Sequence, residues 1–241
     1  MDNAAYVALT RQTGLLKAMQ AAAHNIANIS TTGYRGEGVI FTEVLVNHDG
    51  PPGTIAMSSA RVRLSDMRNA ALTPTGGTLD LGLDGPGFFT IDTPQGLRLT
   101  RTGAFTRSLA GEMVTLEGHP VLDDGGAPIF LPPDAATISI SSDGTIDAGG
   151  QILGRVGVVE LTDLSQLTRQ SGLLFDAGDA PLEPAVTTRV VQGSLEGSNV
   201  DGVLEMARMI EIHRAYELNA TFLDREDQRI RAVIRTLGQP A

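Results

Sequence analysis

The sequence has 241 residues, 41% of them hydrophobic, which is enough for one large domain or two small ones with a buried core. Its formal net charge of −10 argues against a nucleic-acid partner, because phosphate binding needs clustered cations. Cysteine is absent and Lys17 is the single lysine, which excludes disulfides, thiol nucleophiles and P-loop chemistry.

Residues 1–33 are predicted to form a helix that ends near Ile29, where Ser30-Thr31-Thr32-Gly33 is a run of turn formers. The small residues Ala18 and Ala21–Ala23 would let another helix approach closely. A narrow stripe recurs at steps of four and three along this helix, and its members are Ala5, Leu9, Gln12, Leu16, Met19, Ala23 and Ile26.

Residues 34–75 have a different character and are expected to form an extended connector with some hairpin character. Val39–Phe41 and Val44–Val46 resemble short strands. They are followed by a strong turn signal, Asp49-Gly50-Pro51-Pro52-Gly53.

Residues 76–193 are predicted to form an all-β domain, a sandwich or an irregular barrel, because short strand-like runs alternate with glycine turns. Hairpin turns are expected at 124–126, 143–144 and 149–150. A short helix is expected within 163–175. The predicted strands cover 87–91, 97–100, 113–116, 120–122, 128–131, 137–140, 151–161 and 187–192.

Residues 194–241 are predicted to contain a second long helix, capped by Asn199 or Asp201 and ended by Gly238 and Pro240. From Asp201 onward it would run roughly 55 Å. Its stripe keeps to steps close to the seam spacing of a coiled coil, and its apolar members are Met206, Met209, Ile212, Tyr216, Ala220, Leu223, Ile230, Ile234 and Leu237.

These elements predict an α+β protein, with a glycine-rich antiparallel β domain flanked by two long helices that pair in a coiled-coil-like manner. Either the helices pair within one chain, or several copies pack together, since two narrow stripes leave little to anchor helices of this length. Asparagines on and beside the helices either fix register or act as caps. The candidate assembly interface is Leu9, Leu16, Met19, Asn25, Ile26, Asn28, Asn199, Met209, Ile212, Tyr216, Asn219, Leu223, Ile230, Ile234 and Leu237.

No catalytic constellation, cofactor site or metal site is predicted. The four histidines lack metal-ligand spacing. Asp143-Gly144-Thr145-Ile146-Asp147 lacks the later ligands of a calcium loop and is interpreted as a β-turn. The many aspartates between 80 and 124 are interpreted as acidic turns rather than as a glycosidase pair.

Three blocks of the sequence, in the same order, resemble the flagellar rod and hook proteins. The first is Ala23-His24-Asn25-Ile26-Ala27-Asn28-Ile29-Ser30-Thr31-Thr32-Gly33-Tyr34-Arg35, which departs mildly from the family signature at His24, Ile26 and Tyr34. The second is Leu79-Asp80, Gly85-Pro86-Gly87-Phe88-Phe89 and Thr100-Arg101-Thr102-Gly103-Ala104-Phe105, continued by Met113-Val114-Thr115 with Gly118. The third is Gln192-Gly193-Ser194-Leu195-Glu196-Gly197-Ser198-Asn199-Val200 and Arg214-Ala215-Tyr216-Glu217-Leu218-Asn219.

The resemblance implies a non-enzymatic structural subunit of the flagellar rod, which polymerises through its terminal helices into the torque-transmitting shaft across the periplasm. The length excludes the much longer hook protein. The family contains two kinds of rod protein with a β domain, one of which is FlgG. The segments Ser165–Phe175 and Glu196-Gly197 favour the other kind, and FlgG is kept as the alternative.

The implied partners are FlgG, FlgC, FlgB, further copies of the chain and the flagellar export apparatus, with no nucleic acid and no membrane insertion. Composition alone indicates a cytoplasmic protein, since the N-terminus lacks the pattern of a cleaved signal. The resemblance replaces this with the basal body, reached by export without a cleaved signal.

Two other classes of protein remain as alternatives. A β-sandwich glycan hydrolase would need a deep pocket that holds paired carboxylates. A coiled-coil adaptor with a β-domain head would be distinguished from a rod subunit by its failure to polymerise with rod proteins.

Overall fold

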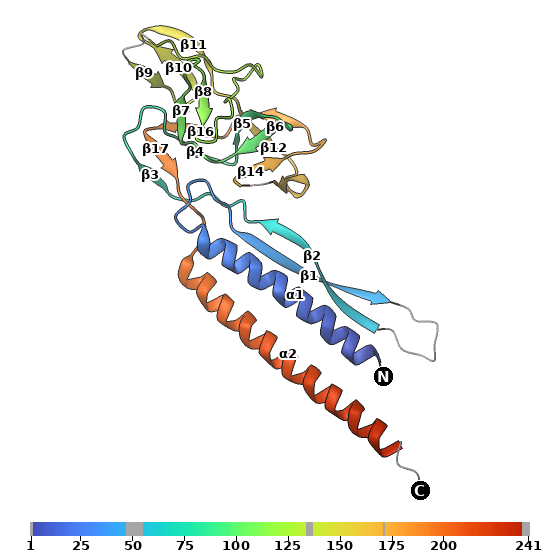
Figure 1. The fold of residues 1–241 in the computed structure, drawn as a ribbon. Coiled ribbons are helices and arrows are strands. Elements are labelled where there is room, and N and C mark those ends of the chain that lie inside the picture. Colours follow the sequence, from blue (N-terminus) through green and yellow to red (C-terminus); the bar gives the residue numbers. More distant parts are fainter. Residues whose placement is uncertain (1, 47–54, 134–136, 171, 238–241) are drawn as a thin grey trace. The chain divides into compact units, whose positions relative to one another are not determined.

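The computed structural model describes residues 2–46, 55–133, 137–170 and 172–237, in two compact units (Figure 1). The helical unit comprises Met1–Ala27, Glu37–Asp66 and Asp201–Ala241, and the β unit comprises Asn28–Gly36 and Met67–Val200. The chain therefore passes between the units four times. The turn expected at 49–53 and the helix end expected at 238–240 lie outside the described residues.

In the helical unit, α1 (Asp2–Ala27) and α2 (Gly202–Leu237) lie side by side and run in opposite directions (Figure 1). The Asp201 carboxylate caps α2, since Oδ1 accepts hydrogen bonds from the backbone N–H groups of Val203 and Leu204 at 2.9 and 3.1 Å. Asp201, rather than Asn199, is therefore the cap of this helix.

The segment expected to be a connector contributes a long antiparallel hairpin to the helical unit. Its strands are β1 (Glu37–Val46) and β2 (Ile55–Ser65), paired from Glu37 with Ser65 to Val46 with Ile55. Both strands contact α1. A two-stranded hairpin is only marginally stable by itself in water, so packing against α1 stabilises it.

The β unit is built from antiparallel strands, and the α+β class predicted from the sequence is confirmed. A six-stranded sheet has the order β13-β14-β6-β5-β12-β15, formed by Thr168–Arg169, Leu174–Asp176, Gly96–Thr100, Phe88–Thr93, Val158–Leu161 and Leu182–Pro184. A three-stranded sheet has the order β11-β10-β9, formed by Gln151–Arg155, Thr145–Ala148 and Ile138–Ile140. Three pairs complete the unit: β16 (Arg189–Gln192) with β4 (Leu81–Asp84), β17 (Ser194–Glu196) with β3 (Leu72–Pro74), and β7 (Phe105–Arg107) with β8 (Met113–Thr115).

Some predicted strands differ in the structure. Residues 120–122 and 128–131 form isolated bridges rather than strands. The run 151–161 is interrupted at Gly157, where a Cβ atom would lie 2.3 Å from Thr90 Oγ1. The short helix expected within 163–175 is a single 3₁₀ turn, η1 (Leu164–Gln166).

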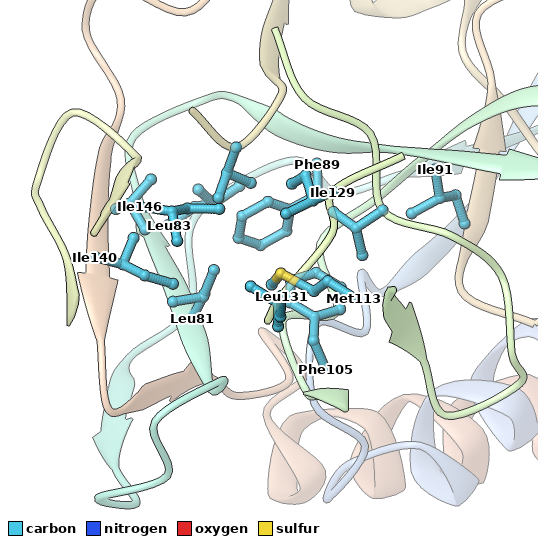
Figure 2. Close-up of a cluster of buried hydrophobic side chains, with 13 residues drawn as sticks. Leu81, Leu83, Phe89, Ile91, Phe105, Met113, Ile129, Leu131, Ile140 and Ile146 are labelled. Atoms are coloured by element: carbon cyan, nitrogen blue, oxygen red, sulfur yellow. The ribbon is translucent and has the colours of Figure 1, made fainter. Parts of the chain in front are cut away.

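Strand β5 separates two apolar cores in the β unit. Because successive side chains of a strand point to opposite faces, Phe88 and Phe89 enter different clusters. Phe89 packs with Leu81, Met113 and Leu131 in the larger core, which Figure 2 shows. Phe88 packs against Phe175 in the smaller core, with the two rings edge to face and their centroids 5.7 Å apart.

Candidate functional site: helix faces and a buried ion cluster

The predicted stripe of α1 does not coincide with the face that the isolated chain buries. Leu9 and Leu16 are 52% and 47% exposed, while Met19 and Ile26 are half-buried. The buried face of the helix carries small residues instead, namely Ala8, Ala18, Ala21 and Ala22. The alanines of α1 therefore allow α2 and the hairpin to approach it closely. Two leucines of α1, seven residues apart, face solvent.

On α2, most of the predicted stripe is half-buried. This group comprises Met209, Ile212, Tyr216, Ala220, Leu223 and Ile230, whereas Met206 is 52% exposed. Ile234 is 65% exposed, and the side chain of Leu237 lies outside the described part of the structure.

Two of the predicted asparagines form buried hydrogen bonds inside the helical unit. The Asn219 amide donates to the carbonyl of Ala8 at 2.9 Å and so sets the register of α2 against α1. The Asn25 amide donates to the carbonyl of Glu37 at 2.8 Å and accepts from its N–H at 2.7 Å. Asn25 thus satisfies both backbone groups of the first residue of β1, as a neighbouring strand would.

The other two predicted asparagines belong to the β unit and hold turns. Asn28 Oδ1 accepts from the Thr31 hydroxyl at 3.1 Å. Asn199 Oδ1 accepts from the N–H of Gly36 at 2.7 Å, and its amide donates to the carbonyl of Arg68 at 3.0 Å. The candidate residues are therefore divided between the two units, with Asn28 and Asn199 in the β unit and the others in the helical unit.

A groove of about 450 Å³ lies between α1 and α2, lined by Val7, Ala8, Arg11, Ala215, Leu218, Asn219 and Phe222. Its lining contains no carboxylate, so it does not meet the requirement of a glycan hydrolase. Across the described residues, no three His, Asp or Glu side chains gather as metal ligands. Among the helices that the structure describes, none is both long and apolar enough to cross a membrane.

The segment that begins at Asp143, interpreted from the sequence as a β-turn, starts with a turn in which the N–H of Gly144 donates to the carbonyl of Ser141 at 2.9 Å. Asp143 accepts hydrogen bonds from the N–H and the hydroxyl of Thr145 at 3.1 and 2.9 Å, and these bonds lower the pKa of its carboxyl group. Gly144 supplies the left-handed backbone conformation, with a φ of 88°.

A buried ion cluster in the β unit was not predicted. Arg35, Arg101 and Glu196 are at most 1% exposed. Glu196 Oε1 accepts from Arg35 Nη2 at 2.6 Å and from the N–H of Ala70 at 2.9 Å. Glu196 Oε2 accepts from Arg101 Nη1 at 3.3 Å. A single carboxylate thus faces two buried guanidinium groups.

Aromatic rings and carbonyl groups help to stabilise the excess positive charge of this cluster. The Arg101 guanidinium lies 4.8 Å from the centroid of the Phe88 ring, and its Nη2 donates to the carbonyl of Gly85 at 2.8 Å. Arg169 donates to the carbonyl of Arg35 and lies over the ring of Tyr34. Burial lowers the pKa of Arg101 to about 10 despite the attraction of Glu196, so this side chain remains charged at neutral pH.

The three sequence blocks quoted above meet at this cluster. Gly33, in the first block, has a φ of 69°, and a Cβ atom there would lie 2.6 Å from the N atom of Thr102 in the second block. The N–H of Gly33 donates to the carbonyl of Glu196 in the third block at 2.8 Å. A Cβ atom on Gly103 would lie 1.6 Å from the carbonyl oxygen of Leu81. These glycines are required because the backbones approach closely.

The only signal of the cluster in the sequence is that its charged residues stand inside the quoted blocks. Arg35, Arg101 and Glu196 are separated by 66 and 95 residues in sequence, and no periodicity connects them. Their pairing becomes visible only when the strands are placed.

Two family models match the chain. Residues 82–148 match the flagellar hook protein FlgE/F/G D1 domain, and residues 191–236 match the flagellar basal body rod FlgEFG protein C-terminal domain. The first range contains Arg101 and much of the larger core, and the second contains Glu196 and nearly all of α2.

Known proteins resemble the chain over nearly its whole length. It is 37% identical to the flagellar basal-body rod protein FlgF of Caulobacter vibrioides and 38% identical to that of Rhizobium meliloti, with 99% of both chains covered in each case. It is 32% identical to the rod protein FlgG of Agrobacterium fabrum, over 91% of this chain and 93% of that one. The branch favoured by Ser165–Phe175 and Glu196-Gly197 is thus FlgF, and FlgG is the next most similar. The chain belongs to the FlgF family of flagellar basal-body rod proteins and is a structural, non-enzymatic subunit of the rod.

Proposed function

We propose that the helical unit joins this subunit to the rod, and that the exposed stripe of α1 is the surface that neighbouring subunits cover. The observation that carries the proposal is the exposure of Leu9 and Leu16 on a helix whose opposite face is already packed. Leucines seven residues apart are typical of a seam between helices, so neighbouring helices would pack on them in a coiled-coil-like manner.

The buried ion cluster would carry load between the terminal segments and the β unit. Arg35 lies two residues before β1 begins at Glu37, and Glu196 lies five residues before the chain enters the helical unit at Asp201. Glu196 bonds to both Arg35 and Arg101, the latter in the middle of the β unit. Torque applied to the helices would therefore reach the β unit through segments that are held together by buried charge.

In the assembled rod, the subunit would contact FlgG, FlgC, FlgB and further copies of itself, and would transmit torque across the periplasm. It would reach the basal body through the flagellar export apparatus. Membership of the FlgF family supports assembly with other rod proteins and a location in the flagellar basal body.

The test is a double substitution, Leu9→Asp with Leu16→Asp, examined for swimming and for the amount of the chain in isolated basal bodies. Both side chains are exposed, so the fold should be retained and incorporation into the rod should be lost. The matched control is Leu109→Asp with Leu116→Asp, at exposed leucines of the β unit that are 110% and 72% exposed. Normal swimming and incorporation of the leucine variant would falsify the proposal.

A further inference from the structure

The chain leaves the β unit for the hairpin through a short irregular segment. Residues Tyr34–Gly36 belong to no helix or strand and lie directly before β1. We call Tyr34–Gly36 the crossing segment. Segments of this kind are the usual hinges between compact units, because a few loop residues can absorb large changes in φ and ψ. Gly36 has the most conformational freedom of the three, since it lacks a Cβ atom.

Two residues of the β unit bind the backbone of the crossing segment. Asn199 Oδ1 accepts from the N–H of Gly36 at 2.7 Å, and the N–H of Asn199 donates to the carbonyl of Tyr34 at 3.3 Å. Arg169 donates to the carbonyl of Arg35. Each residue of the segment therefore has a bonded backbone group, and rotation at a hinge would break these bonds.

Asn199 also connects a second place where the chain passes between the units. Its amide donates to the carbonyl of Arg68 at 3.0 Å. Arg68 is the second residue of the β unit after the chain returns from the hairpin, and Asn199 itself lies two residues before the chain leaves again at Asp201. One carboxamide thus holds together three of the four passages between the units.

Arg169 connects the crossing segment to the smaller apolar core. Its guanidinium group lies 4.8 Å from the centroid of the Tyr34 ring and 5.0 Å from that of the Phe175 ring, and Phe175 is fully buried in this core. A guanidinium group is attracted to the face of an aromatic ring. Arg169 belongs to Ser165–Phe175, the segment that favours FlgF over FlgG.

We propose that Asn199 and Arg169 are positioning residues that make the crossing segment rigid, so that it does not act as a hinge. The buried ion cluster holds the side chains of Arg35 and Glu196, whereas Asn199 and Arg169 hold the backbone, where a hinge would turn. The inference rests on the proposed function and adds the groups through which load would pass into the β unit.

The test is the spread of distances between the two units in the purified full-length chain. The chain has no cysteine, so Gln20→Cys on α1 and Glu183→Cys on β15 give two unique and exposed sites for spin labels. Pulsed electron–electron double resonance measures the width of the distance distribution. We expect a narrow distribution in this labelled chain and one at least twice as wide after adding Asn199→Ala or Arg169→Met.

The matched control is Gln192→Ala, which removes another carboxamide that joins backbone segments of the β unit. Gln192 Oε1 accepts from the N–H of Ile140 at 2.9 Å. Its amide donates to the carbonyls of Thr78 and Ile138 at 2.7 and 3.1 Å. These bonds lie away from the passages between the units, so the control should leave the width unchanged. Broadening in the control equal to that of the two variants overturns the inference.

Amide hydrogen exchange gives a second measurement that needs no label. The N–H of Gly36 should exchange at least tenfold faster in Asn199→Ala than in the parent chain, because its acceptor is lost and local opening becomes easier. It should exchange at the parent rate in Gln192→Ala. An exchange rate of Gly36 that does not respond to the loss of the Asn199 side chain overturns the inference.

Unchanged widths in both Asn199→Ala and Arg169→Met also overturn it. The double substitution at Leu9 and Leu16 separates this inference from the proposed function. Normal incorporation of that leucine variant into basal bodies removes the proposed function. Its loss of incorporation, together with unchanged widths in the two crossing-segment variants, removes the rigid crossing alone.

Discussion

At the scale of single residues, Glu196 is the position in the β unit whose substitution we expect to leave buried charges without a partner. Its carboxylate is the group that both Arg35 and Arg101 contact, and all three side chains are buried. A buried pair adds little stability compared with apolar packing, but removing one partner leaves an uncompensated charge in the interior.

Glu196→Gln should lower the free energy of unfolding by about 3–5 kcal/mol, because two guanidinium groups then lack a counter-charge. Urea unfolding followed by circular dichroism measures the change. The control Glu183→Gln, at an exposed position of β15, should stay within about 0.5 kcal/mol of the parent. An equally small effect at Glu196 would show that the cluster contributes nothing to folding.

Gly33 tests whether close backbone approach explains the Thr-Thr-Gly of the first sequence block. Gly33→Ala should cost about 2 kcal/mol more than Gly76→Ala in the same unfolding experiment. Both glycines have positive φ, 69° and 75°, but a Cβ atom at Gly76 meets no atom within 4 Å. The difference therefore isolates the contact with Thr102, and equal costs would rule that contact out.

At this scale, the sequence predicts features that depend on nearby residues but not contacts between distant ones. The cap at Asp201 and the turn at Asp143-Gly144 depend on nearby residues, so both could be predicted from the sequence. The Arg35–Glu196 pair joins residues 161 positions apart, which no local pattern can reveal.

At the scale of elements, α1 has two faces with different requirements. Ala21 and Ala22 are buried, whereas Leu16 lies on the opposite, exposed side. The pattern of hydrophobic residues predicts an interface through the leucines, because large apolar side chains define that pattern. Close approach of two helices depends instead on small side chains, which such a pattern does not register.

Ala22→Leu should lower the free energy of unfolding by about 1–3 kcal/mol, because the buried face has no space for the added carbon atoms. Leu16→Ala should change it by less than about 1 kcal/mol, since the leucine side chain is already half exposed. Thermal unfolding of the two purified variants measures both effects. The reverse order would mean that α1 packs through its leucine stripe after all.

The hairpin shows a second limit of sequence reasoning at the element scale. Strand signals at 39–41 and 44–46 indicated a hairpin, but not that it extends from Glu37 to Ser65 along α1. The attachment of the hairpin depends on Asn25, whose side chain bonds to the backbone of Glu37. From the sequence alone, an asparagine near a helix end is interpreted as a cap.

At the scale of the whole molecule, the order helix, β elements, helix and the α+β class were predictable, because periodicity and glycine turns report them directly. The division into units was not. Residues 37–66 join the terminal helices, while 28–36 join the β unit, so one unit is assembled from three separate segments. Contacts between residues far apart in the chain determine such a division, and these contacts produce no periodic pattern in the sequence.

The isolated subunit exposes the leucine stripe of α1, and we propose that its neighbours in the rod cover this stripe. The most direct measurement is maleimide labelling of single-cysteine variants, Leu16→Cys and, as a reference on an exposed turn of the β unit, Leu109→Cys, in the purified chain and in isolated basal bodies. We predict that both cysteines react rapidly in the purified chain and that the one at position 16 reacts at least tenfold more slowly in basal bodies. Equally fast labelling of position 16 in basal bodies would contradict the account.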